Sequence, residues 1–148
     1  MATKKFSLEY IAGIVDGEGC ISIHVNRARA ARFANQQPRV VMQLAVSNCY
    51  KPLIDALHQQ FGGTINRHQD YHNPNARPNW RWCLSEQAAC KLVSKLFPYL
   101  FIKAKQAALL LMLGKMKALN GRHRLSNAQV KERLRIAKMC SRLNRRGR

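Results

Sequence analysis

Acidic residues are scarce in this sequence. Against 26 Lys and Arg there are only 7 Asp and Glu in 148 residues, which gives a formal net charge of +19 at pH 7. Because such a charge repels itself in the free protein, it points to a polyanionic partner. Nucleic acid is the leading candidate. An anionic membrane surface is the rival, but no separate amphipathic segment carries a one-sided basic face. A ribosomal type of RNA-binding protein shares this composition, so charge alone does not separate DNA from RNA.

Long apolar runs and cysteine pairs are also missing. No stretch of about 18 apolar residues occurs, so we expect no membrane span and no membrane partner. Residues 1–6 contain lysines, but no apolar stretch with a cleavage site follows, so the sequence predicts no signal peptide. The cysteine count of 5 is odd, and no two of them form a CxxC pair. This usage predicts reduced, mostly buried thiols in an intracellular protein.

The length suits one domain with a sizeable core rather than two, and neither an internal repeat nor a low-complexity tract appears. Apolar spacing predicts the order of elements: a helix over 8–16, strands over 20–26 and 39–47, a helix over 52–61, strands over 64–70 and 79–84, then helices over 86–96, over 103–119 and from about 127. Hairpins between adjacent strands make the sheet antiparallel with one wet face, and the helices cover the other face. The predicted class is α+β.

The last part of the chain differs in charge from the rest. Nearly half of the basic residues follow Gly114, accompanied by a single acid, Glu132. We expect one domain over residues 1–148, with a core over about 7–119 and a basic helical extension over about 120–148. The extension is either a helix that clamps a nucleic-acid backbone or a basic tail.

One short segment carries the chemistry. Residues 10–19 read YIAGIVDGEG, in which a short helix ends in two carboxylates, Asp16 and Glu18, within a glycine-rich turn. Ala12 and Gly13 are small, and small residues allow two helix backbones to approach closely. From the residues alone, a glycine-terminated helix with incidental solvated acids explains the pattern as well as a catalytic site does.

The same segment resembles the signature of the LAGLIDADG homing endonucleases. It matches position by position, with Ile11, Ile14 and Val15 as the aliphatics, Ala12 and Gly13 as the small pair, Asp16 and Glu18 as the two acids and Gly19 as the last glycine. The predicted elements after it match that family's αββαββα core, so the resemblance covers roughly residues 7–119. It implies a homing-endonuclease fold with an antiparallel DNA-binding sheet and extra C-terminal helices.

The resemblance implies a homodimer, because one motif supplies one half of the active unit and no second copy occurs here. It assigns Ala12, Gly13 and Asp16 to the dimer seam, where Asp16 would cap or brace a neighbouring helix end. It assigns metal binding to Glu18, one from each subunit, with the backbone carbonyl of Gly17 as an additional ligand. Many members carry Asp at the position of Glu18, and the longer arm of Glu leaves the metal geometry less defined.

The implied reaction is hydrolysis of both strands of double-stranded DNA with Mg²⁺. A divalent ion held by hard oxygen ligands activates water and stabilises the leaving oxygen. Mn²⁺ is expected to substitute, and Ca²⁺ to bind without supporting cleavage. The resemblance further assigns a catalytic lysine to Lys103, with Lys105 as second choice, and polar residues near the water to Asn48 and Lys51. Each has an ordinary alternative, as a solvated lysine at a helix start, a turn asparagine and a solvated surface charge.

The wet face of the sheet is the predicted DNA-binding surface, because a twisted antiparallel ribbon fits the major groove and presents alternate side chains to base edges. Alternation selects Ser22, His24, Asn26, Arg39, Gln43, Asn66, His68, Arg77, Asn79 and Arg81. The first hairpin loop adds Arg27, Arg29 and Arg32, which should reach phosphates or outer bases. Singly, each is as well explained as a plain surface residue.

Several alternatives stay open. A zinc site from His68, His72 and Cys83 lacks a second ligand pair. Trp80 and Trp82 are expected to pack into the core rather than to stack on nucleobases. The function implied is a free-standing, intron-encoded endonuclease that promotes mobility of its host intron, in a prokaryotic cytoplasm or an organelle. The alternative is a non-cleaving binder on the same fold, either an RNA-splicing maturase or a DNA-binding regulator.

Overall fold

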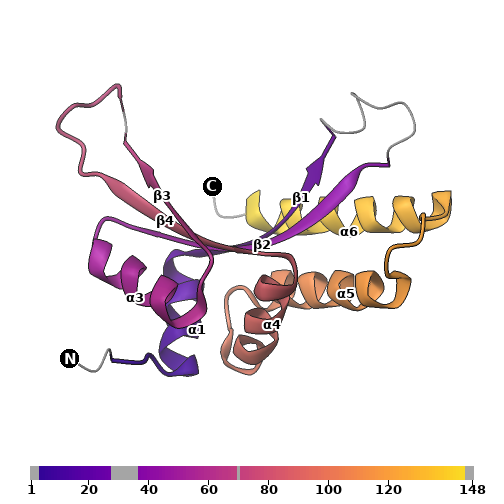
Figure 1. The fold of residues 1–148 in the computed structure, drawn as a ribbon, viewed down its shortest axis with the longest axis horizontal. Coiled ribbons are helices and arrows are strands. Elements are labelled where there is room, and N and C mark those ends of the chain that lie inside the picture. Colours follow the sequence, from indigo (N-terminus) through magenta and orange to yellow (C-terminus); the bar gives the residue numbers. More distant parts are fainter. Residues whose placement is uncertain (1–3, 28–36, 70, 146–148) are drawn as a thin grey trace.

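A computed structural model describes residues 4–27, 37–69 and 71–145 of the chain (Figure 1). Its elements follow the predicted order: α1 (Leu8–Glu18), β1 (Gly19–Asn26), β2 (Arg39–Asn48), α3 (Lys51–Phe61), β3 (Thr64–His68), β4 (Asn79–Ser85), α4 (Glu86–Leu96), the 3-10 turn η1 (Phe97–Tyr99), α5 (Ala104–Asn120) and α6 (Asn127–Arg145). The predicted α+β class is confirmed.

The four strands form one antiparallel sheet in the order β1-β2-β4-β3. Helices α1, α3, α4 and α5 lie below it, and α6 runs beside β1 (Figure 1). The two hairpins rise on either side, so the opposite face of the sheet is concave and open. We call this the wet face.

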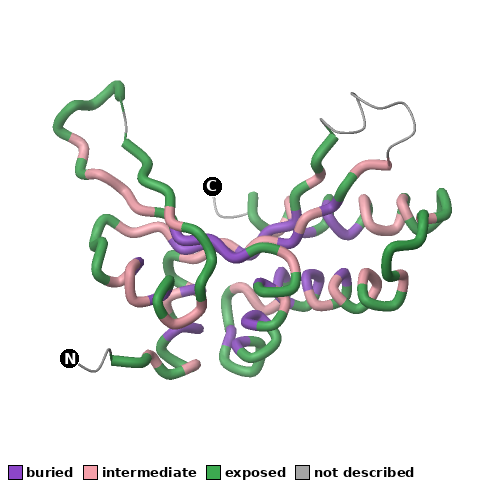
Figure 2. Tube along the Cα trace, in the orientation of Figure 1, coloured by how far each residue is buried: buried purple, intermediate pink, exposed green. Residues whose placement is uncertain are grey.

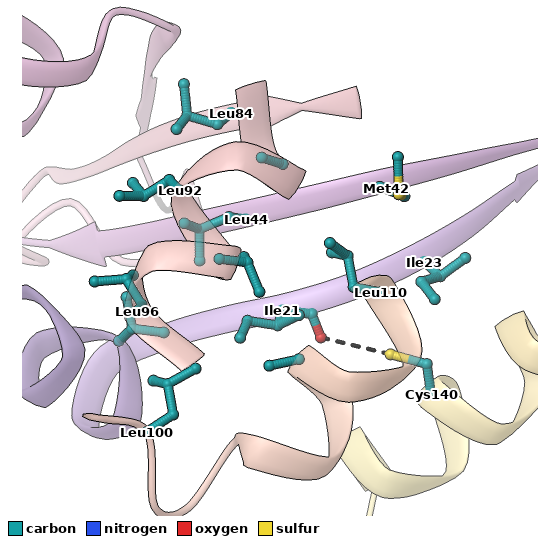
Figure 3. Close-up of a cluster of buried hydrophobic side chains, with 14 of the residues drawn as sticks. Ile21, Ile23, Met42, Leu44, Leu84, Leu92, Leu96, Leu100, Leu110 and Cys140 are labelled. Atoms are coloured by element: carbon teal, nitrogen blue, oxygen red, sulfur yellow. Dashed lines mark hydrogen bonds between the residues drawn. The ribbon is translucent and has the colours of Figure 1, made fainter. Parts of the chain in front are cut away.

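The core lies where the sheet meets the helices (Figure 2). On β2 the side chains of Val40, Met42, Leu44 and Val46 are buried, as the alternation predicts, and the small Ala45 on the other face is buried as well. These side chains meet leucines of α4 and α5 beneath the sheet (Figure 3). Trp82 is fully buried, and its Nε1–H donates to the carbonyl of Gly62 at 2.8 Å, so it packs rather than stacks on a base.

Element ends differ from prediction by a few residues. Helix α1 runs to Glu18 instead of Asp16, and it ends at Gly19, where a Cβ would lie 2.7 Å from the Cα of Val15. The chain thus needs glycine to turn from helix into strand. Strand β3 ends at His68 instead of residue 70, because its pairing with β4 stops at Asn79.

Strand β4 pairs with β2 only over Gln43–Asn48. Along the rest of this edge of β2, side chains form hydrogen bonds with the backbone. Glu86 adopts a left-handed φ of 54°, and its carboxylate accepts a hydrogen bond from the backbone N–H of Met42 at 3.1 Å. Lys117 donates to the same carboxylate at 2.8 Å and also to the carbonyl of Val40. The pair therefore satisfies backbone groups that a sheet edge would leave open, and it ties α5 to the sheet.

Of the two alternatives for the C-terminal extension, the structure shows a helix over residues 127–145. An apolar side of this helix packs inward, with Ala137 and Cys140 buried. The expected thiol burial holds for Cys83 and Cys140 only, because Cys20 and Cys90 are half-buried and Cys49 is exposed. Among the described residues, no helix is both long and apolar enough to cross a bilayer.

Candidate active site and nucleic-acid interface

The side chain of Asp16 joins the end of α1 to the segment at the start of α5. Its carboxylate accepts hydrogen bonds from the backbone N–H groups of Phe101 at 2.7 Å and Lys103 at 3.0 Å. Partial burial raises the pKa of Asp16, but the N–H groups of Phe101, Lys103 and Ile102 outweigh it and hold the pKa below its usual value. The resemblance placed Asp16 at the seam between copies; the helix end that it braces here belongs to its own chain.

Lys103 lies at the same junction. Its ammonium donates to the backbone carbonyl of Asp16 at 2.6 Å, at the negative end of the α1 dipole. Lys105, the second choice, is exposed and lines a hollow between α5 and α6 beside Arg142. Of the two lysines, Lys103 is the one that the fold directs to the end of α1.

Glu18 is the last residue of α1, and its carboxylate is exposed. The side-chain amide of Asn48, at the end of β2, donates to one of its oxygens. The amide carbonyl of Asn48 accepts from the backbone N–H of Tyr50 at 2.7 Å. Because that turn fixes the carbonyl end, the amide N–H is aimed at Glu18. The fold thus brings Glu18, Asn48 and Lys103 together around the last turn of α1.

Lys51 is not joined to Glu18. Its ammonium is 2.6 Å from a carboxylate oxygen of Asp55, one turn along α3, and 5.2 Å from the centre of the Trp80 ring. Both partners of this ion pair are about half exposed, and such a pair contributes little to stability. Moving the ammonium from Asp55 toward a phosphate would therefore cost little free energy. The catalytic role of Lys51 stays a prediction.

The small residues of α1 separate onto two faces. Ala12 is 1% exposed and packs in the core of its own chain, so it is not on the open side where the resemblance expects the seam. Gly13 and Gly17 are exposed, and a Cβ added at either would meet no atom within 4 Å. Being four residues apart, they share one face, close to the exposed Tyr10. We call Tyr10, Gly13 and Gly17 the open face of α1.

On the wet face, polar side chains are linked across three strands. His24 Nε2 lies 2.9 Å from Ser22 Oγ and 3.0 Å from Gln43 Oε1. Arg81 donates to the same Gln43 oxygen at 3.1 Å. These contacts hold long polar side chains in fixed directions above the sheet, which suits reading of base edges in a groove.

The other predicted DNA-binding residues differ in their solvent exposure. Asn79 is half-buried, and the exposed ones are Asn26, Arg27, Arg39, Asn66, His68 and Arg77. Ser22 is only 7% exposed, because the end of α6 lies against it, so it supports His24 rather than reaching a base. Arg29 and Arg32 lie outside the described residues.

No protein-family model and no curated protein sequence matches the chain. Solved structures do match. Homing endonuclease I-CvuI, in complex with the I-CreI target DNA, has a TM-score of 0.72 and 21% identity over 92% of this chain and 80% of that one. Homing endonuclease I-TnaI has a TM-score of 0.71 and 19% identity over 96% of both chains. The LAGLIDADG homing endonuclease I-SmaMI, bound to cleaved DNA, has a TM-score of 0.69 and 14% identity over 90% of this chain and 43% of that one.

The chain has the fold of the LAGLIDADG homing endonucleases. This confirms the fold that residues 10–19 and the order of elements predict, on a sequence where identity to these structures is low. Helix α1 rises from the helix layer to the sheet (Figure 1), and its last residue, Glu18, directly precedes β1.

The donors around α1 fit a divalent cation only in part. Glu18 offers an exposed carboxylate and Gly17 a backbone carbonyl, both hard oxygen donors that suit Mg²⁺, whereas the Asp16 carboxylate is engaged with backbone N–H groups. No group of three or more His, Cys, Asp or Glu gathers in the part of the chain that the structure describes. This argues against the zinc site of His68, His72 and Cys83, and it makes a Mg²⁺ site in the LAGLIDADG fold dependent on a second copy or on phosphate oxygens.

Sequence reasoning missed one cation on β3. Arg67 is exposed on β3, 5.7 Å from the Trp80 ring, although alternation selects only Asn66 and His68 there. The hairpin arm extends beyond the helix layer, so both faces of β3 are open and alternation does not discriminate. On α6, for which the sequence offers a nucleic-acid clamp as one alternative, the cations recur at helical spacing.

Proposed function

We propose that the protein is a homodimeric, site-specific homing endonuclease that hydrolyses both strands of a long, pseudo-palindromic DNA target with divalent metal ions and so promotes mobility of its host intron. The observation that carries this proposal lies at the end of α1, beside a concave basic sheet. There Asn48 donates to the exposed Glu18 carboxylate, and Lys103 donates to the backbone carbonyl of Asp16 two residues earlier. A pure DNA binder needs neither an aimed carboxylate nor a lysine directed to the same helix end.

The proposal of a homodimer rests on exposed surface around α1. The open face of α1 allows close contact with an identical helix, and Phe101 and Ile102, next to the Asp16 junction, are 89% and 67% exposed. Such neighbouring apolar side chains favour a protein contact. A two-fold contact uses the same patch on both copies. This chain spans only 43% of I-SmaMI, a length that a second copy would supply.

Each residue of the site has a part in the proposed reaction. Glu18 and the Gly17 carbonyl would hold the metal, which when bound activates water and neutralises charge on the phosphate. Asn48 keeps the Glu18 carboxylate in one orientation. Lys103 would place a positive charge near the phosphate, which becomes more negative in the transition state. This charge would stabilise the transition state more than the bound substrate. Mg²⁺ is the proposed physiological ion, with Mn²⁺ substituting and Ca²⁺ binding without cleavage; complexes of I-CvuI were solved in the presence of Mg and of Ca.

DNA is proposed to lie along the wet face. His24, Gln43 and Arg81 are directed by their mutual contacts toward base edges. Arg27 directly follows β1 and Arg39 begins β2, at the outer ends of the first hairpin's strands, where backbone phosphates would pass. Arg favours guanine and Gln favours adenine in the major groove. Binding that depends on these cations should weaken steeply as salt rises.

The test is incubation of plasmid that carries the host-gene region with wild-type protein, Glu18→Gln and Glu9→Gln, with and without Mg²⁺. Glu9→Gln is the matched control, because it removes an exposed acid from the other end of α1. We expect wild type and Glu9→Gln to linearise the plasmid only with Mg²⁺, and Glu18→Gln to bind it without cutting. Cutting by Glu18→Gln at the wild-type rate refutes the assignment of Glu18. Binding without cutting by the wild type favours the non-cleaving regulator or maturase.

A further inference from the structure

Helix α6 is fixed against the free edge of β1. The side-chain amide of Asn144 donates to the carbonyl of Ile21 at 3.0 Å, and the Cys140 thiol points to the same oxygen at 3.7 Å (Figure 3). At the start of the helix, the side chain of Gln37 makes paired hydrogen bonds with the backbone of Leu125, at 2.6 and 3.1 Å. Because Gln37 precedes β2, beyond the last strand pair Asn26–Arg39, α6 is tied to the outer end of the first hairpin's strands as well as to β1 at Ile21.

One face of α6 is a row of cations. Lys131, Lys138, Arg142 and Arg145 are spaced by seven, four and three residues, which places them along one side of a helix. Together with Arg27 at the end of β1 they line a groove of about 750 Å³ between α6 and β1. We call Arg27, Lys131, Lys138, Arg142 and Arg145 the outer strip.

Among the described residues, no acid pairs with the outer strip. Glu132, the acid of α6, is paired with Arg135 at 2.7 Å. Over residues 4–27, 37–69 and 71–145, no ion pair involves a member of the outer strip. Five like charges on one groove repel each other, so the free protein bears an energetic cost that an anionic ligand would relieve.

The groove opens onto the wet face. His24, which contacts Gln43 above the sheet, also lines the groove. A second hollow, shared by Ser22, His24, Asn144 and Arg145, brings the end of α6 over the middle of β1. A duplex seated on the wet face would therefore pass beside the outer strip, whereas a ligand bound on the helix layer below would not.

We propose that the outer strip binds the phosphate backbone of the same duplex DNA, outside the base contacts made by the sheet. This rests on the proposed function, because it takes the DNA on the wet face as given. From Lys131 to Arg145 the helix rises about 21 Å, which corresponds to about six nucleotides along one strand. The contacts made there are electrostatic and independent of base sequence, so α6 adds affinity and register but no specificity.

The test compares two triple variants that lose equal charge. Lys138→Gln/Arg142→Gln/Arg145→Gln removes three cations of the outer strip. The control, Lys91→Gln/Lys95→Gln/Lys115→Gln, removes three exposed lysines from α4 and α5, below the sheet. Binding to mixed-sequence duplex DNA is measured by fluorescence anisotropy from about 50 to 200 mM NaCl. Mixed-sequence duplex suffices because the proposed contacts ignore sequence. Double-stranded RNA of equal length serves as the second probe, and thermal melting checks that both variants are folded.

We expect the outer-strip variant to bind DNA at least tenfold more weakly than the control. Its slope of log Kd against log salt should be shallower by about two to three, because each phosphate that the protein no longer neutralises removes about 0.9 from the slope. Equal affinity and slope in the two variants would overturn the proposal while leaving the nuclease assignment intact. A loss confined to RNA would overturn it in favour of an RNA surface. Failure of the wild type to bind duplex DNA at all would remove the proposed function together with this inference.

Discussion

At the scale of the residue, two carboxylates two positions apart do different work because different groups face them. Asp16 meets backbone N–H groups at the start of α5, whereas Glu18 is exposed and meets the amide of Asn48. Through the resemblance, the sequence predicts Glu18, Asn48 and Lys103 as one site. In the structure Asn48 contacts Glu18 and Lys103 donates to the carbonyl of Asp16 at the same helix end, while their catalytic roles stay predictions. It does not predict the partners of Asp16, because Phe101 and Lys103 are more than 80 residues away and meet Asp16 only through packing.

Asp16 makes stability depend on pH in acid. Its pKa is lowered in the folded protein, because the N–H groups of Phe101, Lys103 and Ile102 overcome the raising effect of burial. Its stabilising effect is therefore fully present above the unfolded pKa of about 4 and is lost as pH falls below it. We expect Asp16→Asn to lower the free energy of unfolding by about 1 kcal/mol at pH 7. In urea titrations between pH 7 and pH 2, its difference from wild type should shrink; a constant difference would contradict this role.

Lys103 and Lys105 provide a matched pair for the catalytic lysine. Lys103 donates to the end of α1, and Lys105 lines the hollow between α5 and α6. Replacing Lys103 with Met should lower the single-turnover cleavage rate by about a hundredfold or more, the usual cost of removing one stabilising donor. The same change at Lys105 should leave the rate within a few fold. Equal losses in the two variants would show that the effect comes from net charge rather than from position.

At the scale of the element, alternation and helical spacing predict which faces are buried wherever an element packs on the core, as on β2 and α6. They do not predict the arms of the sheet, where both faces are open, as at Arg67. Nor do they show that Glu86 and Lys117 complete the edge of β2, since that contact joins α4, α5 and β2 and depends on a left-handed residue that is not glycine.

The docking of α6 can be followed through cysteine chemistry. Burial, and to a smaller extent the neighbouring Cys20, raise the pKa of Cys140 to about 11, so its thiol stays protonated and covered. Cys49 is exposed. With an alkylating reagent at pH 8, mass spectrometry should find Cys49 modified first and Cys140 modified only under unfolding conditions. Rapid modification of Cys140 in the native protein would mean that α6 leaves β1.

The open face of α1 can be tested without disturbing the core. The Cβ of a leucine at Gly13 would meet no atom of its own chain within 4 Å, and leucine improves helix propensity, so we expect the melting temperature of the single chain to be unchanged or slightly higher. The same side chain would hold two α1 helices apart. Analytical ultracentrifugation should show Gly13→Leu as a monomer at concentrations where the wild type and the control Ala88→Leu, on the exposed side of α4, form dimers.

At the scale of the whole molecule, charge and shape act together. The 26 basic residues face only 7 acids, and two of these acids are already engaged, Asp16 by backbone N–H groups and Glu132 by Arg135. The sequence predicts an antiparallel sheet with one covered face, because hairpins join its strands. The strand order β1-β2-β4-β3 and the position of α6 beside β1 follow from three-dimensional packing, which local spacing does not encode.

The most direct test of the two-copy active site is a crystal structure of the wild-type protein on a bound DNA duplex in the presence of Ca²⁺. We expect two chains on one duplex, with their α1 helices touching along the faces that carry Gly13 and Gly17. A carboxylate oxygen of Glu18 from each chain should lie about 2.3–2.6 Å from a calcium ion. A single chain on the duplex, or two Glu18 side chains far apart without a cation between them and the phosphates, would contradict it.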